Sequence, residues 1–309
     1  MEETIERINP GNSLIKLLLF MAIFGVGIQL LIMGIALLIM KIMHPESPSD
    51  FSFLQESSVS LKIMLLMSSI CTFILPAWLL YQIESRVNPY FQKIKDIPII
   101  HYIYVFAAML CFIPMMALIA HWNESMQLPA SLQSIQEWMR VSEDSAAVMT
   151  KKIVEESTWT GLIVNLIILA IIPAIGEEMV FRGCLQNIFG RWIANKHLVI
   201  WLVAILFSAF HLQFFGFIPR MLLGAFFGYL YVWSKNIYLP IFGHFVNNAS
   251  ATITAFYYSR KGISFEEMNK FEQEPIWVYL ASLIFTVIFV VLYYHSTKKI
   301  AHGARLEEN

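Results

Sequence analysis

Long apolar blocks dominate the chain, and their length predicts the architecture. The hydrocarbon core of a bilayer is about 30 Å thick, so a helix that crosses it needs roughly 20 apolar residues. Seven blocks contain no Lys, Arg, Asp or Glu: Leu17–Met40, Ile63–Ile83, Ile97–Ala120, Ser157–Gly176, Leu198–Pro219, Asn236–Ser259 and Pro275–Tyr294. An eighth block, Met221–Ser234, is shorter. We expect it to extend over Phe217–Arg220, with the Arg220 side chain reaching outward to the interface.

These blocks predict a polytopic integral membrane protein with eight transmembrane helices. The composition agrees, because 58% of residues are hydrophobic and only 14% are charged, whereas soluble domains have roughly a quarter charged. Backbone N–H and C=O groups have no water to bind inside a bilayer, so each span satisfies its own groups by forming a helix. The predicted fold class is therefore all-α.

The connection at residues 121–156 predicts a helix of a different kind. Its apolar side chains share one broad face at helical spacing: Leu132, Ile135, Trp138, Met139 and Val148. Its charged residues lie mostly elsewhere on the helix. Such an amphipathic helix is expected to lie in the plane of the membrane interface. Two roles stay open for it, a simple connector and a part in admitting a substrate.

The basic residues of the connections predict the orientation. More of them fall on the side that holds both termini, which places the termini in the cytoplasm. The first apolar block is too long for a signal-peptide core, so we expect a retained helix. The protein would then reside in a membrane, the inner membrane if the cell is bacterial. We divide the chain into three regions: helices one to three with the long loop (1–156), the core helices (157–259), and the last helix with a charged tail (260–309).

The strongest chemical signal is a pair of acids and an arginine directly after the fourth apolar block. Charged side chains at that depth cost at least ~2.5–3.5 kcal/mol each, so they usually pair and usually mark function. Glu178 and Arg182 are four residues apart on one helical face, in the favourable order. Glu177 is rotated by about 100° from Glu178. We therefore predict Glu178–Arg182 to be a structural pair and the unpaired Glu177 to be a base.

Three further polar side chains lie on later spans. His211 is a lone imidazole, and His244 and Asn248 lie four residues apart on one face of another helix. A carboxylate, two imidazoles and a carboxamide can activate water and stabilise an oxyanion. The same His, His and Glu set could bind zinc, although the chain has no His-Glu-x-x-His helix.

The depth of these groups sets a condition on the fourth helix. His211 lies roughly 21 Å along its span from His197, at 1.5 Å per residue. Glu177 reaches a similar depth only if the fourth helix runs past Arg182, to about Gly190. Arg182, Gln186 and Asn187 would then line a cavity that faces the cytoplasm.

The three motifs Glu177-Glu178-x-x-x-Arg182, Phe207-x-x-x-His211 and His244-x-x-x-Asn248, in this order, resemble those of the CPBP family. This family comprises the CAAX prenyl endopeptidase and its bacterial relatives, also called abortive-infection proteins. The likeness covers about residues 157–259. It implies an eight-helix intramembrane endopeptidase in which Glu177 and His211 activate water. It also implies that His244 and Asn248 form the oxyanion site, with Glu178 and Arg182 in support.

The resemblance also implies the partners. We expect membrane lipids around the chain, a peptide or a lipidated protein as substrate, no nucleic acid, and no cofactor, with a divalent metal as the less favoured option. The alternative function is a non-catalytic scaffold, immunity factor or regulator of the same family. A proton-coupled transporter would need helices broken by Gly or Pro in both halves, and Pro76 and Pro173 are too sparse for that.

Overall fold

The computed structural model describes residues 8–43, 57–91, 97–155, 157–268 and 270–307. This part of the chain contains helices and no strand, which confirms the all-α class. Several helices are composite, because α-helical segments continue through π-helical ones without a break. The first is α1 (Pro10–Phe20), η1 (Met21–Ile28) and α2 (Gln29–Met43), and the second is α4 (Ser58–Ser69), η2 (Ile70–Ile74) and α5 (Leu75–Glu84).

The remaining elements follow in chain order. The third long helix is α6 (Ile99–Glu124), and the long loop holds η3 (Ala130–Leu132) and α7 (Gln133–Val154). The fourth, called helix four below, is α8 (Trp159–Asn165), η4 (Leu166–Ile171), α9 (Ile172–Glu178), η5 (Met179–Leu185) and α10 (Gln186–Trp192). Then come α11 (Lys196–Phe210), η6 (Phe214–Gly216), α12 (Phe217–Ser234), α13 (Tyr238–Arg260), α14 (Phe265–Met268) and α15 (Ile276–Glu307).

The protein is an integral membrane protein. Within the described residues, six helices are long and apolar enough to cross a bilayer: Pro10–Met43, Ser58–Glu84, Ile99–Glu124, Trp159–Trp192, Phe214–Ser234 and Ile276–Lys298. The fifth predicted span is the shorter helix α11, and the seventh is the 23-residue helix α13, which carries the polar residues of the third motif. The predicted number of eight is therefore not confirmed.

The predicted end of the fifth span is wrong. The block was expected to be helical to Pro219, although Phe217–Arg220 were also assigned to the next span. Instead α11 ends at Phe210 and the chain reverses. Helix α12 then begins at Phe217, as expected for that next span. Leu212 adopts a left-handed conformation with φ of 53°, which a helix cannot contain. The apolar residues that follow hide this turn from a pattern search, because they continue the block on the far side of the reversal.

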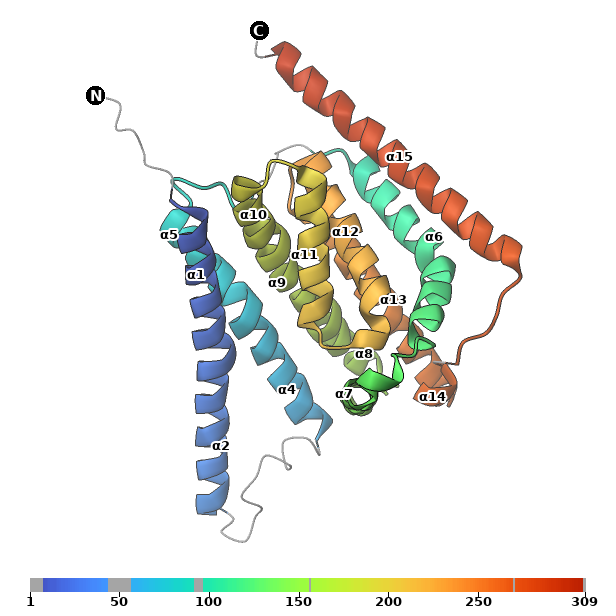
Figure 1. Cartoon of the computed structure of the whole chain (residues 1–309). Coiled ribbons are helices and arrows are strands. Elements are labelled where there is room, and N and C mark those ends of the chain that lie inside the picture. The colour runs from blue at the N-terminus through green and yellow to red at the C-terminus, as the bar shows by residue number, and fades with distance from the viewer. Residues whose placement is uncertain (1–7, 44–56, 92–96, 156, 269, 308–309) are drawn as a thin grey trace.

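Helix four lies between the N-terminal helices and the α11–α13 group (Figure 1). Gly176 allows a close approach to the second helix, because an added Cβ would lie 2.9 Å from Phe73 and 3.1 Å from Ile74. On the other side of the molecule, α6 packs along α15, and His101 Nε2 lies 2.8 Å from Ser296 Oγ. Helix four is thus covered by the N-terminal helices on one side and by the α11–α13 group on the other. The three-part division of the chain stays a prediction.

The helix expected in the long loop is present as α7, and it is oriented in an unusual way. Its apolar side chains face outward, with Ile135, Trp138 and Val148 each about half exposed. Its charged side chains hold the protein instead: Glu143 Oε2 accepts a hydrogen bond from the Phe215 N–H at 3.1 Å. This arrangement suits a helix whose outer face meets lipid. Figure 1 shows α7 and α14 at the end of the molecule opposite to α10.

Candidate active site

Helix four runs without interruption from Trp159 to Trp192. It therefore continues past Arg182 and Gly190, as the expected depth of Glu177 requires. The π-helical segment Met179–Leu185 directly follows the two glutamates, and another, Leu166–Ile171, precedes them. A π-helical turn is wider than an α-helical one and is often found at functional sites. Helix four therefore carries Glu177 and Glu178 on an α-helical segment, α9, between two widened segments.

The predicted pair of Glu178 and Arg182 is present and is completely buried. Arg182 Nη1 donates to Glu178 Oε1 at 2.8 Å, and neither side chain is exposed. Arg182 Nη2 also donates to the Gly224 carbonyl at 2.6 Å. One turn further on, Gln186 Nε2 donates to the Gly228 carbonyl at 3.2 Å. Helix four is thereby joined to α12 by two consecutive side-chain bridges.

The glycines of α12 also explain how α11 comes close. An added Cβ at Gly224 would lie 3.2 Å from the Ala204 Cα, and one at Gly228 would lie 2.9 Å from Ile200. The small-residue spacing predicts a close helix contact, and the contact is made with α11. This packing fixes the position of the α11 end, where His211 is the C-terminal capping residue.

Glu178 has a second partner, which the spacing along helix four could not predict. His244 Nδ1 lies 2.8 Å from Glu178 Oε1, the same oxygen that Arg182 binds. Because a carboxylate only accepts, His244 donates from Nδ1 and turns Nε2 towards Glu177. The His244 ring also stacks on Phe227, with centroids 5.2 Å apart and an interplanar angle of 16°. Glu178 therefore positions an imidazole as well as an arginine.

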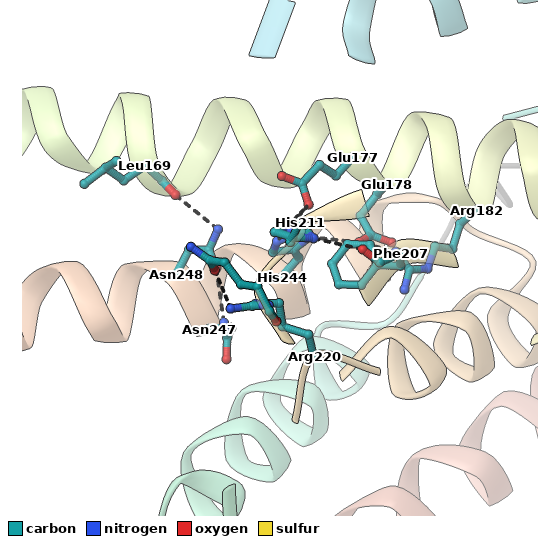
Figure 2. A network of polar contacts seen from close by, with 11 residues as sticks. Leu169, Glu177, Glu178, Arg182, Phe207, His211, Arg220, His244, Asn247 and Asn248 are labelled. Atoms are coloured by element: carbon teal, nitrogen blue, oxygen red, sulfur yellow. Dashed lines mark hydrogen bonds and ion pairs between the residues drawn. The ribbon is translucent and has the colours of Figure 1, made fainter. Parts of the chain in front are cut away.

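Glu177 faces both imidazoles across a short gap, as Figure 2 shows. Its Oε2 lies 3.7 Å from His211 Nε2 and 3.9 Å from His244 Nε2, and it has no hydrogen-bond partner among the described residues. His211 donates from Nδ1 to the Phe207 carbonyl at 2.8 Å, because a carbonyl only accepts. His211 therefore also turns Nε2 to Glu177. The three groups are too far apart for direct hydrogen bonds and close enough to share one water molecule.

Asn248 lies beside this gap on α13. Its Nδ2 donates to the Leu169 carbonyl at 3.1 Å, within the first π-helical segment of helix four, and its Oδ1 accepts from Asn247 Nδ2 at 3.1 Å. Since an amide nitrogen carries two protons, one N–H of Asn248 remains for another acceptor. The structure thus brings Glu177, His211, His244 and Asn248 together, from three separate elements.

A cavity of about 540 Å³ contains these four side chains. Its remaining wall comes from α12, α13 and two elements outside the predicted motifs, α7 and α14. Thr150 and Val154 of α7 line it, as do Phe265 and Met268 of α14. The sequence indicated a role for the long loop only as one of two options, and gave no indication of α14.

The predicted cavity of Arg182, Gln186 and Asn187 is present in part and is separate from this site. That it faces the cytoplasm stays a prediction. Arg182 was expected to line it, but the Arg182 side chain is fully buried in its ion pair. Gln186 and Asn187 line a different cavity, of about 470 Å³, next to Tyr90, Arg191 and Lys235. The cavity with Glu177 is instead bordered by α7 and α14, at the opposite end of helix four (Figure 1).

Arg220 is the residue that sequence reasoning placed incorrectly. It was expected to extend outward to the interface, but it lines the same cavity as Glu177. Arg220 Nη1 donates to the Gln213 carbonyl at 2.8 Å, and Nη2 binds the Gln213 side chain. The left-handed turn at Leu212 brings Gln213 to a position where it binds Arg220, so the Arg220 side chain lines the cavity.

A zinc site formed by the same donors was the alternative that the sequence left open. Within the part of the chain that the structure describes, no group of three or more His, Cys, Asp and Glu side chains converges closely enough to hold a metal ion. Glu178 Oε1 accepts from both His244 and Arg182, so this oxygen and His244 Nδ1 are occupied by hydrogen bonds within the protein.

Comparison with known proteins adds an independent finding. Residues 148–250 match the family model of type II CAAX prenyl endopeptidase Rce1-like proteins. The chain carries an Rce1-like domain. The resemblance that three sequence motifs indicated is thereby confirmed. The Rce1-like domain begins near the end of α7 and contains helix four, α11, α12 and the first half of α13.

The comparisons reach only part of the molecule. YpbD, an uncharacterized protein of Bacillus subtilis (strain 168), is 30% identical to the chain over 89 residues. This match covers 28% of the chain and 42% of YpbD, so the chain matches less than half of that relative's length. No solved structure matches the chain. Phe265 and Met268 line the cavity and lie outside the Rce1-like domain.

Proposed function

We propose that this protein is an intramembrane endopeptidase that hydrolyses peptide bonds of membrane-associated substrates. The observation that carries the proposal is the buried Glu177 Oε2, which is unpartnered at 3.7 and 3.9 Å from two imidazole nitrogens. The cavity around it is large enough for a peptide segment. The Rce1-like family model supports the reaction class. The catalytic roles below rest on geometry and on the resemblance together.

In the proposed reaction, Glu177 takes a proton from water while His211 Nε2 orients it. The hydroxide adds to the substrate carbonyl carbon and forms a tetrahedral intermediate. The C–N bond then breaks, and the proton held by Glu177 passes to the departing amine. General base and acid catalysis of this kind typically contributes ~10²–10⁴ in rate.

His244 and Asn248 are proposed to stabilise the oxyanion of the intermediate. Asn248 has an N–H to spare, but His244 donates from Nε2 only if its ring carries both protons, because Nδ1 already donates to Glu178. Two carboxylates face this ring: His244 Nδ1 lies 2.8 Å from Glu178 Oε1, and Nε2 lies 3.9 Å from Glu177 Oε2. Glu178 thus has a proposed positioning role.

The proposed substrate is a peptide or a lipidated protein that reaches the cavity from the membrane. The proposed reaction uses no cofactor and no nucleic acid. Both termini are proposed to lie in the cytoplasm. The α7 side of the cavity would then face away from the cytoplasm.

The test replaces one oxygen at Glu177. In proteoliposomes with a cleaved peptide, Glu177→Gln is expected to lower kcat by about 10²–10⁴, because the amide cannot accept the water proton. The matched control is Glu272→Gln, the same change at an exposed carboxylate. Thermal unfolding of both variants should match the unsubstituted protein. Full activity of Glu177→Gln would refute the mechanism.

The same variant separates catalysis from scaffolding. If deletion of the gene has a phenotype, a non-catalytic scaffold predicts complete rescue by Glu177→Gln, whereas the peptidase predicts none.

A further inference from the structure

Two arginines border the site, and their environments differ. Arg182 is fully buried and paired with Glu178 at 2.8 Å. Arg220 lines the cavity and makes no ion pair with any described carboxylate. A cation at membrane depth is expensive without a partner, so an unpaired one in a cavity usually marks a pathway or a binding site.

The Arg220 guanidinium has donors to spare. It carries five N–H groups, and its bonds to the Gln213 carbonyl and side chain use two of them. Arg220 lines the cavity, so the remaining N–H groups of its guanidinium are near the space that a substrate would fill. A guanidinium with free donors fits a carboxylate in a bidentate geometry.

The surrounding chain holds Arg220 in this position. Asn123 of α6 accepts from the Ile218 N–H at 2.8 Å and donates to the Phe214 carbonyl at 3.2 Å. The first turn of α12 is therefore fixed by a neighbouring helix. Gly216 leaves room for the guanidinium, because an added Cβ would lie 2.6 Å from Arg220 Nη2. Arg220 is thus positioned by its neighbours rather than free to swing outward.

Arg220 also lies close to the reacting groups. It is one helical turn before Gly224, whose carbonyl binds Arg182, or about 6 Å along α12. Arg220 is near enough to Glu143 of α7 and to Glu177 for an electrostatic interaction with each, although it forms no ion pair with either. Arg220 and Glu177 are the charged side chains that face the cavity among its described lining residues, apart from the two histidines.

We propose that Arg220 determines specificity by binding a carboxylate of the substrate next to the bond that is cleaved. The inference rests on the proposed peptidase function, which it deepens. The carboxylate could belong to the C-terminus of the substrate chain or to an acidic side chain, and both offer the same two oxygens. A bound carboxylate would also supply an anion in direct hydrogen-bond contact, whereas the described partner of Arg220 at that distance is the neutral Gln213.

The test measures binding and cleavage separately. The probes are three fluorescein-labelled, N-palmitoylated peptides of the same apolar sequence: one ends in a carboxylate, one in a carboxamide, and one in a carboxamide with an Asp among its last residues. Binding is measured by fluorescence polarisation to the full-length Glu177→Gln protein in nanodiscs, where no turnover interferes. Cleavage is measured with Glu177 present.

At least one acidic peptide should bind about 10- to 100-fold more tightly than the neutral peptide, as expected for a hydrogen-bonded charge pair. Whichever acidic peptide is preferred identifies the source of the carboxylate. Arg220→Gln should abolish the preference and leave the affinity for the neutral peptide unchanged. Arg220→Lys should retain part of it, since it keeps the charge and loses the planar fork. Arg260→Gln, the matched loss of an arginine outside the cavity, should retain all of it.

The protein that keeps Arg220 provides the first decisive result. If it binds the three peptides equally, or binds none of them, the inference is overturned. A preference that survives Arg220→Gln would overturn it as well. A carboxylate preference without cleavage would refute the peptidase function alone. Cleavage that ignores both the carboxylate and Arg220 would refute the inference alone.

Discussion

Glu177 and Glu178 are adjacent in the sequence but have different environments, because consecutive residues of a helix point about 100° apart. Glu178 meets Arg182 on its own helix and His244 on α13, while Glu177 turns to a gap between two imidazoles. The (i, i+4) spacing predicted the first contact because both residues lie on one helix. It could not predict the His244 contact, which depends on how α13 packs against helix four. Thus the ion pair could be predicted from the sequence, and the role of Glu178 as a shared acceptor could not.

The buried pair of Glu178 and Arg182 is expected to show strong coupling. Arg182→Met leaves Glu178 buried with one donor fewer, which should destabilise the protein by about 3–5 kcal/mol. The double variant Glu178→Gln/Arg182→Met removes both charges and should regain a large part of that loss, while cleavage stays impaired because His244 loses its anionic partner. Thermal unfolding is followed by the reactivity of Cys184, which is fully buried. The coupling would be contradicted if the loss of stability in the double variant equalled the sum of the losses in Arg182→Met and Glu178→Gln measured separately.

At the scale of elements, the apolar pattern identified each long helix, and its errors concentrate where α11 turns into α12. The predicted block Leu198–Pro219 has no Asn, Asp or Pro near Phe210, so the pattern gave little reason to end the helix there. The direction of the Arg220 side chain is a separate error: the pattern placed Arg220 on the correct helix, but it could not show that Gln213 lies where it binds this side chain. The amphipathic pattern in the long loop correctly predicted a helix, α7. It did not indicate that the charged face would hold the protein.

The contact between α7 and α14 is expected to control how tightly the cavity is covered. Lys151 Nζ lies 2.6 Å from Glu266 Oε1, and residues next to both line the cavity. This hydrogen bond lowers the pKa of Glu266 and raises that of Lys151. The contact therefore weakens when the pH falls through the lowered Glu266 pKa or rises through the raised Lys151 pKa, and it is intact at neutral pH.

Glu266→Gln should accordingly speed hydrogen exchange in α14 and in the last turn of α7 at neutral pH. The charge swap Lys151→Glu/Glu266→Lys should return exchange to the original rate, whereas Glu267→Gln, the matched change one residue along, should leave it unaltered. Added salt should reduce the difference, because both side chains are exposed to solvent. Identical exchange in the original chain and Glu266→Gln would show that the pair does not hold α14.

At the scale of the whole molecule, two features stand out where the described N-terminal helices pack against the Rce1-like domain. One is the close contact at Gly176, next to the catalytic candidates. The other lies at the C-terminal end of helix four, around the buried Glu84. Ser13 Oγ, Lys16 Nζ and Asn88 Nδ2 donate to its carboxylate at 2.7, 3.0 and 3.1 Å, and the Tyr90 hydroxyl binds it as well. Arg191 of α10 in turn donates to Tyr90.

The Glu84 cluster is therefore expected to hold α1 and α5 to helix four. Glu84→Gln keeps the shape and removes the charge that four donors share. Since hydrogen bonds to a charged group contribute about 1.5–3 kcal/mol, the protein should lose stability of that order. Proteolysis of the first two helices should become faster, while binding of a peptide in the Glu177 cavity should change little, because the cluster and the cavity lie at opposite ends of helix four. Glu124→Gln, at an exposed carboxylate, is the matched control. Equal stability of Glu84→Gln and Glu124→Gln would mean that apolar packing alone, centred on Gly176, joins the two parts.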